Sequence, residues 1–268
     1  MDASCDLSVV MPALKEGANL QLLLPELRSV LDDIGIRYEI LVVTYPSDRG
    51  TNEAATRAGG RIVAQSERGY GGALLAGFAA ARGAYILTMD ADISHRPAFV
   101  RDLWASRQAG EVTIASRFVR GGRAHMPAGR YLLSRVLNAF FRWGLGLPFH
   151  DLSSGFRLYK ADVVQAQPLA ARDFDILPEI LVRAHTAGWH VQEIPFDYAP
   201  RQYGSSNARI IQFGVAYLMT FLSLRKLRNS LLADDHDWAP HDPVAVAKLG
   251  PRTGVSTPFP RRMRAWSR

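Results

Sequence analysis

The sequence has a single cysteine, Cys5, among its 268 residues. One cysteine excludes an intramolecular disulfide framework and is typical of proteins that work in a reducing compartment. A lone cysteine just before an apolar strand is more often inert than reactive, so we interpret Cys5 as structural.

Long apolar runs are also missing. No stretch reaches the roughly 18–20 uninterrupted apolar residues that a bilayer-spanning helix needs. The opening "MDASCDLSVVMPALKEG" begins with an acidic residue and is apolar only briefly, unlike a signal peptide. We therefore expect a cytoplasmic protein, with peripheral attachment at the inner face of the membrane kept open.

Several recognition motifs are absent as well. The sequence has no zinc-finger spacing, no G-x-x-x-x-G-K-[ST] loop and no G-x-G-x-x-G at the start of a helix. The net charge of +7 indicates a polyanionic partner: nucleic acid, an anionic membrane or a phosphorylated ligand. Because the basic residues form no long block, we expect no nucleic-acid partner.

What the sequence does contain is an alternation of short apolar strands and helical patterns up to about residue 116. Such alternation predicts an α/β fold with a mostly parallel central sheet flanked by helices. Strands are expected at 7–13, 38–45, 61–65, 85–92 and 112–116, and helices at 16–35, 51–58, 69–83 and 97–109. We interpret the Gly-rich helix 69–83 as a close-packing helix, because no phosphate-binding motif opens it.

The pattern changes after Arg117. The remaining elements expected are helices at 131–146 and 177–188, strands at 155–160 and 190–200, and an apolar segment at 208–228 with a basic end. That last segment fits either an amphipathic helix on an anionic bilayer or a helix packed at a homo-oligomer contact. Residues 231–268 have weak periodicity and are expected to be extended or disordered.

The strongest chemical signal is "YILTMDADISH". Asp90 and Asp92 follow a buried strand, at the end where open α/β sheets bind ligands. At a spacing of two in extended backbone, both carboxylates point the same way and repel each other unless a cation joins them. A hard divalent ion completed by substrate phosphates fits that geometry. A pair of solvated loop aspartates is the alternative.

Six segments in order carry a resemblance to a known family. They are "VVMPALKEGANL", "GYGGALLAGFAAARGAYILTMDAD", "ASRFVRGG", "HDLSSGFRLYK", "LPEILVRA" and "PRQYGSSN". Over about residues 7–228 the chain resembles the GT-A family 2 glycosyltransferases, most of all their dolichol/polyprenol-phosphate mannosyltransferase branch. Each motif alone is weak, but the ordered set is specific.

The resemblance implies a Rossmann-like GT-A fold for nucleotide-diphospho-sugar transfer. It implies a catalytic domain at 1–207, a C-terminal apolar and basic helix at 208–230 and a basic tail at 231–268. The implied activity is inverting transfer of a hexose, dependent on Mg²⁺ or Mn²⁺. The donor would be a GDP- or UDP-sugar, and the acceptor a polyprenyl phosphate or another phosphate-bearing molecule.

The resemblance also assigns residues. The donor set comprises Pro12, Ala13, Leu14, Glu16, Thr44, Tyr45, Asp90, Ala91, Asp92 and Arg201. Metal ligands would be Asp90, Asp92 and Ser94, and acceptor contacts would be Arg117, Arg130, Ser134 and Ser154. The catalytic set is Asp92, Arg117 and Asp151, with Asp151 as the candidate base for a hydroxyl acceptor. A phosphate acceptor is already an anionic nucleophile and needs no base.

The chain departs from the family pattern at two places. Thr44 and Tyr45 stand where the family usually has two aspartates that recognise the base or ribose, and Asn207 replaces a lysine. We expect a changed or relaxed nucleotide preference rather than lost activity. A degenerate relative without turnover, and an enzyme acting on a soluble hydroxyl acceptor such as a natural-product or glycan intermediate, remain alternatives.

The histidines show no metal-ligand spacing, so they are interpreted as structural. Those considered are His95, His125, His150, His185 and His190.

Overall fold

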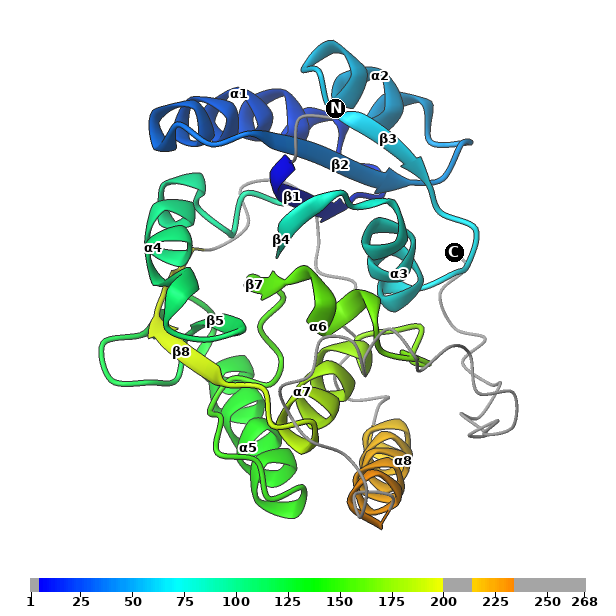
Figure 1. The fold of residues 1–268 in the computed structure, drawn as a ribbon, viewed down its shortest axis with the longest axis vertical. Helices are drawn as coiled ribbons and strands as arrows, with labels where there is room; N and C mark the ends of the chain where they lie inside the picture. The colour runs from blue at the N-terminus through cyan, green and yellow to red at the C-terminus, as the bar shows by residue number, and fades with distance from the viewer. Residues whose placement is uncertain (1–4, 200–213, 234–268) are drawn as a thin grey trace.

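The computed structural model describes residues 5–199 and 214–233 (Figure 1). Its centre is a seven-stranded sheet in the order β3-β2-β1-β4-β7-β5-β8. Every neighbouring pair is parallel except the two that include β7, which runs antiparallel to β4 and β5. A two-stranded parallel sheet, β6-β9, lies apart from it in the pairing.

The strands of the main sheet are β1 (Cys5–Pro12), β2 (Tyr38–Thr44), β3 (Arg61–Ala64), β4 (Gly83–Thr88), β5 (Val112–Ser116), β7 (Arg157–Lys160) and β8 (Val191–Pro195). The small sheet is β6 (Arg123–Ala124) with β9 (Asp197–Tyr198). The helices are α1 (Gly17–Ile34), α2 (Arg49–Arg57), α3 (Tyr70–Ala80), α4 (Val100–Ala105), α5 (Ala128–Gly144), α6 (Ala161–Gln165), α7 (Ile176–Thr186) and α8 (Gly214–Ala233). Two 3₁₀ turns, Pro97–Phe99 and Ser106–Gln108, flank α4.

The sheet separates two hydrophobic cores. Alternate strand residues face opposite sides, so in β1 Val9 and Met11 pack with α1, α2 and α4 while Val10 packs with α3. Figure 1 shows α1 and α4 on one side and α3, α6 and α7 on the other. This three-layer arrangement confirms the predicted α/β fold with a mostly parallel sheet flanked by helices.

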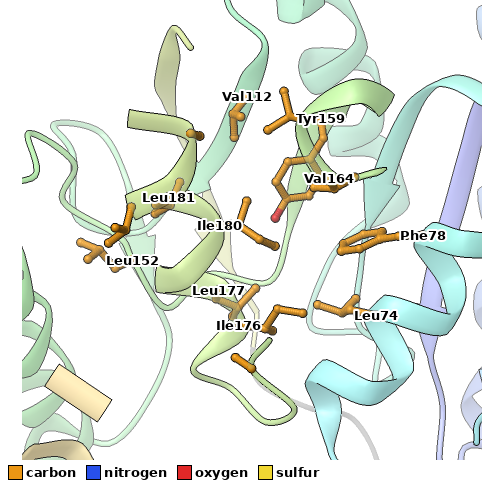
Figure 2. Packing of buried hydrophobic residues seen from close by; sticks show 14 of the residues in the cluster. Leu74, Phe78, Val112, Leu152, Tyr159, Val164, Ile176, Leu177, Ile180 and Leu181 are labelled. Carbon is orange, nitrogen blue, oxygen red and sulfur yellow. The ribbon is translucent and has the colours of Figure 1, made fainter. Parts of the chain in front are cut away.

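The Gly-rich helix α3 packs closely, as expected. An added Cβ at Gly77 would lie 2.2 Å from Cγ1 of Val10, and one at Gly71 would lie 2.6 Å from the backbone carbon of Arg172. Figure 2 shows Leu74 and Phe78 of α3 directed toward the side chains of β7 and α7. The small residues of α3 therefore bring the helix close to its neighbours.

Several predicted elements differ in their bounds. The helix expected at 97–109 is broken into α4 and its two flanking 3₁₀ turns, and neither α6 nor β6 was predicted. Of the expected helix 208–230, the structure describes the part from Gly214, and α8 continues to Ala233. Residues 200–213 and the tail from 234 lie outside the described residues. Among the residues described, no helix is both long and apolar enough to cross a membrane.

Candidate active site

The strand register brings the predicted site segments to one edge of the sheet. Pro12 pairs with Val43 near the carboxyl ends of β1 and β2. Because β7 is antiparallel, its first residue, Arg157, lies opposite Thr88 at the carboxyl end of β4 and opposite Ile114 in β5. The turns that follow β1, β2, β4 and β5 therefore lie at the same edge of the sheet as the loop that precedes β7, as expected for a ligand site in an open α/β sheet.

The turn after β1, which is predicted to bind the donor, is held by the loop after β2. Lys15 has a φ of 60°, a left-handed conformation that is uncommon for a residue other than glycine and that asparagine adopts more readily. Its backbone N–H donates to Oδ2 of Asp48 at 2.6 Å, and the N–H of Glu16 donates to Oγ1 of Thr51 at 3.0 Å. The turn from Pro12 to Glu16 is thus fixed by two side chains of the next loop.

The loop after β2 carries a carboxylate of its own at Asp48, four residues beyond Thr44. Burial opposes its charge, but the N–H of Lys15 and the hydroxyl and N–H of Thr51 outweigh burial and lower the pKa of Asp48. Thr44 is fully buried, and its hydroxyl makes no hydrogen bond to the described residues. Thr44 and the half-buried Tyr45 both stay predicted donor contacts.

The Asp90–Asp92 turn differs from the geometry expected. We predicted extended backbone through both aspartates, but β4 ends at Thr88 and Ile93 has a φ of 66°. The extended-backbone prediction is wrong, because the chain turns here and gives the two carboxylates different surroundings. A β-branched residue in the left-handed region is a true outlier, and such backbone is concentrated at functional sites.

Asp92 is held inside this turn. Its side chain is 2% exposed, and its Oδ1 accepts hydrogen bonds from the N–H of Ser94 at 3.1 Å and from the Ser94 hydroxyl at 2.5 Å. Ser94 therefore orients Asp92 in this structure, while its role as a metal ligand stays a prediction.

Asp90 is held by two residues that the sequence did not indicate. The Tyr70 hydroxyl donates to its Oδ1 at 3.2 Å, and the Asp90 N–H donates to Nδ1 of His95 at 2.9 Å. Nε2 of the same ring lies 3.7 Å from Oδ2 of Asp90, and the ring stacks on Phe156 at 4.6 Å. His95 therefore has a supporting role: it holds Asp90, a residue of the candidate site.

Gly155 leaves the space for Tyr70. A Cβ at that position would lie 2.4 Å from the Tyr70 hydroxyl oxygen and 3.6 Å from Oδ1 of Asp90. Burial, and then the charge of Asp90, raise the pKa of Tyr70 well above its ordinary value, so the phenol keeps its proton and remains a donor.

The residues of this turn fit a hard divalent cation. Two carboxylates and a hydroxyl offer the oxygen ligands that Mg²⁺ and Mn²⁺ favour. Within the described part of the chain, no group of three or more His, Cys, Asp or Glu side chains is placed to hold a metal ion. An ion held by two protein carboxylates takes its other ligands from substrate phosphates and water.

Arg117 and Asp151 form a bidentate ion pair beside this turn. Nε of Arg117 lies 2.8 Å from Oδ2 of Asp151 and its second guanidinium nitrogen lies 2.7 Å from Oδ1. Burial disfavours both charges, but their mutual attraction dominates, so the pKa of Asp151 is lowered and that of Arg117 is raised. The charge of Asp90 also acts on Arg117, in the same direction.

A hydrogen-bond network joins this ion pair to α5. Ser153 accepts from Arg117 at 2.8 Å and from the side-chain amide of Asn138 at 3.0 Å. Asn138 also accepts from the N–H of Leu152 at 2.8 Å and donates to the carbonyl of Ser134 at 2.8 Å. The buried Asn138, which the sequence did not indicate, therefore fixes the loop before β7 to α5, the helix of the predicted acceptor residues.

The remaining predicted residues lie in different surroundings. Ser154 is buried and its hydroxyl donates to the carbonyl of Ala115 at 2.8 Å, so it braces the loop. Arg130 is half-buried in the first turn of α5. Arg201 and Asn207 lie outside the described residues. A hollow of about 430 Å³ adjoins the donor loop through Pro46, but its lining holds none of the predicted site residues.

Comparisons with known proteins show the family to which the chain belongs. Residues 8–166 match the Glycosyl transferase family 2 model. The polyprenol monophosphomannose synthase of Mycolicibacterium smegmatis is 33% identical over 230 residues, which cover 78% of this chain and 84% of that protein. The undecaprenyl-phosphate mannosyltransferase of Micrococcus luteus is 30% identical over 210 residues, which cover 74% and 85%. The chain therefore belongs to glycosyltransferase family 2 and is a glycosyltransferase.

Two further comparisons define the limits of the likeness. The dolichol-phosphate mannosyltransferase of Pyrococcus furiosus is 32% identical over 213 residues, and the match spans 75% of this chain but only 59% of that protein. The glucosyl-3-phosphoglycerate synthase of Mycobacterium tuberculosis, solved with Mn²⁺, UDP and glucosyl-3-phosphoglycerate, superposes with a TM-score of 0.64 at 20% identity, covering 84% of this chain and 80% of that one. This structural likeness confirms the predicted GT-A fold.

Proposed function

We propose that this glycosyltransferase moves a hexose from a nucleotide-sugar to a polyprenyl phosphate, with Mg²⁺ or Mn²⁺ at Asp90 and Asp92. The observation that carries the proposal is the pairing, at one edge of the sheet, of a carboxylate turn with the buried guanidinium of Arg117. The names of the M. smegmatis, P. furiosus and M. luteus relatives support a lipid-phosphate acceptor. The metal-bound UDP complexes of the structural relative support the cofactor.

In this proposal the donor lies across the turn from Pro12 to Glu16 and the Asp90–Asp92 turn. The divalent ion, when bound, would neutralise the negative charge that develops on the departing diphosphate. The chain's own part is to hold Asp92 with Ser94 and Asp90 with Tyr70 and His95, so that the ligand oxygens are fixed before substrate arrives. Preorganised groups of this kind stabilise developing charge without reorganising.

Arg117 would bind the acceptor phosphate, with Arg130 and Ser134 at the entrance on α5. The phosphate oxygen attacks the anomeric carbon from the face opposite the diphosphate, so one carbon–oxygen bond forms as the other breaks and the configuration inverts. This step needs no proton acceptor. Asp151 fits that chemistry, because its lowered pKa and its ion pair make it a positioning residue for Arg117 and a poor general base.

The direct test is product formation. The full chain is incubated with labelled GDP-mannose or UDP-glucose and detergent-solubilised polyprenyl phosphate, with Mn²⁺, with Mg²⁺ or with EDTA. We expect a metal-dependent lipid-linked sugar, absent when the phosphate is replaced by the free polyprenol. Calorimetry with UDP, GDP, dTDP and CDP, each with and without metal, identifies the donor class. If no nucleotide binds, the chain is a degenerate relative and the proposal is wrong.

A further inference from the structure

Arg157, the first residue of β7, carries a buried charge that has no part in the proposed transfer. Its side chain is fully buried, and its guanidinium donates to the carbonyl of Leu152 at 2.7 Å and to that of Leu177 at 2.8 Å. It therefore joins the loop before β7 to the first turn of α7, where Leu152 and Leu177 face the same core (Figure 2). The Nε of Arg157 has no hydrogen-bond partner among the described residues.

A guanidinium held by neutral carbonyls keeps its whole positive charge inside the protein. Burying such a charge is costly unless negative charge lies close enough to offset it. The ion pairs among the described residues use other guanidinium groups, such as that of Arg117 with Asp151 and that of Arg183 with Glu179. The negative charge that offsets Arg157 must therefore act from beyond ion-pair distance.

The strand register places Arg157 between the two halves of the candidate site. On one side it pairs with Thr88, two residues before Asp90, and on the other with Ile114, three residues before Arg117. The turn of Asp90 thus follows one strand that flanks Arg157, and Arg117 follows the other.

The charge of Arg157 acts on groups in both halves. Burial raises the pKa of Asp151, the charge of Arg117 lowers it, and the charge of Arg157 adds to the lowering. Burial and the charge of Asp90 raise the pKa of Tyr70, and the charge of Arg157 opposes them. Since Tyr70 donates to Asp90 at 3.2 Å, the field of Arg157 reaches the support of the predicted metal turn as well as the ion pair.

We propose that Arg157 is a positioning residue that sets the charge balance of the candidate site. A fixed positive charge behind Asp90 and Asp92 weakens the binding of a cation alone and strengthens the binding of an anion, because interior charges act through a low dielectric. The divalent ion would then bind together with the anionic donor rather than ahead of it. The inference rests on the proposed function in taking these carboxylates as cation ligands and Arg117 as an anion ligand.

Ion binding to the full chain tests the inference. Arg157→Gln removes the charge and keeps an amide that can donate to a carbonyl. Mn²⁺ alone is titrated and the free ion is measured by electron paramagnetic resonance, and pyrophosphate alone is titrated by calorimetry in EDTA. We expect Arg157→Gln to bind Mn²⁺ about fivefold more tightly than the parent and pyrophosphate about fivefold more weakly. A purely structural role for Arg157 would weaken the binding of both ions.

Two further variants separate charge from support. Arg157→Lys keeps the charge, but its single ammonium replaces the fork that reaches two carbonyls. Both dissociation constants should stay within about twofold of the parent values while the urea midpoint falls. Arg183→Gln on α7 is the matched control, because it removes a buried guanidinium that is paired with Glu179 at 2.9 Å. It should lower stability and leave the binding of both ions unchanged.

Three results would overturn the inference. The first is an Arg157→Gln variant that shifts both ions in the same direction or shifts neither. The second, which also decides the matter if Arg157→Gln does not fold, is a folded Arg157→Lys variant with weaker binding of both ions. The third is a parent protein that binds neither ion. A parent that binds both ions, with the expected opposite shifts in Arg157→Gln, but forms no lipid-linked sugar would contradict the proposed function alone.

Discussion

Two loops at the same edge of the sheet carry buried aspartates and hold the charge in opposite ways. Asp151, in the loop before β7, is neutralised by a bidentate ion pair with Arg117. Asp92, in the turn after β4, is held by the hydroxyl and N–H of Ser94, which orient the carboxylate without cancelling its charge. The first loop thus uses its carboxylate to fix a cation in place, whereas in the second a hydroxyl and an N–H fix the orientation of the carboxylate.

This difference predicts which substitution affects chemistry and which affects the fold. Replacing a carboxylate that binds a catalytic ion removes transition-state stabilisation and leaves packing intact. Replacing one partner of a buried ion pair leaves the other charge unpaired inside the protein. The four predictions below exploit this contrast.

The largest effect is expected for Asp92→Asn. The amide still accepts the Ser94 hydrogen bonds, but it binds a divalent ion poorly, so kcat/KM should fall about a thousandfold, ~4 kcal/mol of transition-state stabilisation. The midpoint of thermal unfolding without metal should change little. Asp102→Asn, at an exposed site on α4, is the matched control and should retain full activity.

Asp151→Asn should act mainly on the fold. Arg117 would remain buried without its ion pair, which costs about 3–4 kcal/mol of unfolding free energy, measured in urea. The double variant Arg117→Met/Asp151→Leu should recover most of that stability and none of the transfer activity. Recovered activity in the double variant would show that Arg117 does not bind the acceptor phosphate.

Much of this contrast could be predicted from the sequence. The apolar strand before Asp90, the strand that begins at Val112 and the order of the motifs predicted that these segments meet at one edge of the sheet, because strand ends converge in any parallel sheet. The turn at Ile93 could not be predicted, since its conformation depends on the hydrogen bonds of Ser94 to Asp92.

The residues that support the candidate site could not be predicted from the sequence either. Tyr70 reaches Asp90 across 20 residues of sequence, and Asn138 reaches Leu152 and Ser153 across 14 and 15. Asp48 reaches Lys15 across 33. Such contacts depend on how a helix or loop is positioned against the sheet, and periodicity carries no information on that. The need for glycine at position 155 can be explained only once the structure shows that a Cβ there would meet the Tyr70 hydroxyl.

Asp175, just before α7, is a third carboxylate, and its surroundings differ from those of Asp151 and Asp92. Burial, together with the negative charges of Asp173 and Glu179, raises its pKa to about 6 from 3.8. The folded protein therefore holds a proton there that the unfolded chain releases, so charging Asp175 destabilises the fold progressively between about pH 4 and pH 6. Asp175→Asn should stabilise the protein by about 3 kcal/mol at pH 8, about 1.4 kcal/mol for each unit of the shift.

The pH series separates this effect from a simple packing gain. Near pH 4 the folded parent carries a protonated Asp175 and the variant a neutral asparagine. The variant and the parent should therefore unfold at the same urea concentration. An equal gain at both pH values would mean that the Asp175 charge is not the cause. Asp162→Asn, at an exposed site on α6, serves as the control for the substitution itself.

The smallest effect is expected where the support of Asp90 is weakened without touching its charge. Tyr70→Phe removes one hydrogen bond to Oδ1 but keeps the ring that stacks on Phe174 at 4.6 Å. The loss of one such bond corresponds to about 1 kcal/mol, so the concentration of Mn²⁺ needed for half-maximal donor binding should rise about fivefold. Tyr38→Phe removes an equivalent phenol–carboxylate bond, to Asp32 on the surface, and should change nothing in the metal titration. If Tyr70→Phe lowers stability and leaves the Mn²⁺ dependence unchanged, Tyr70 supports only the packing of α3. Metal binding would then not depend on the hydrogen bond from Tyr70 to Asp90.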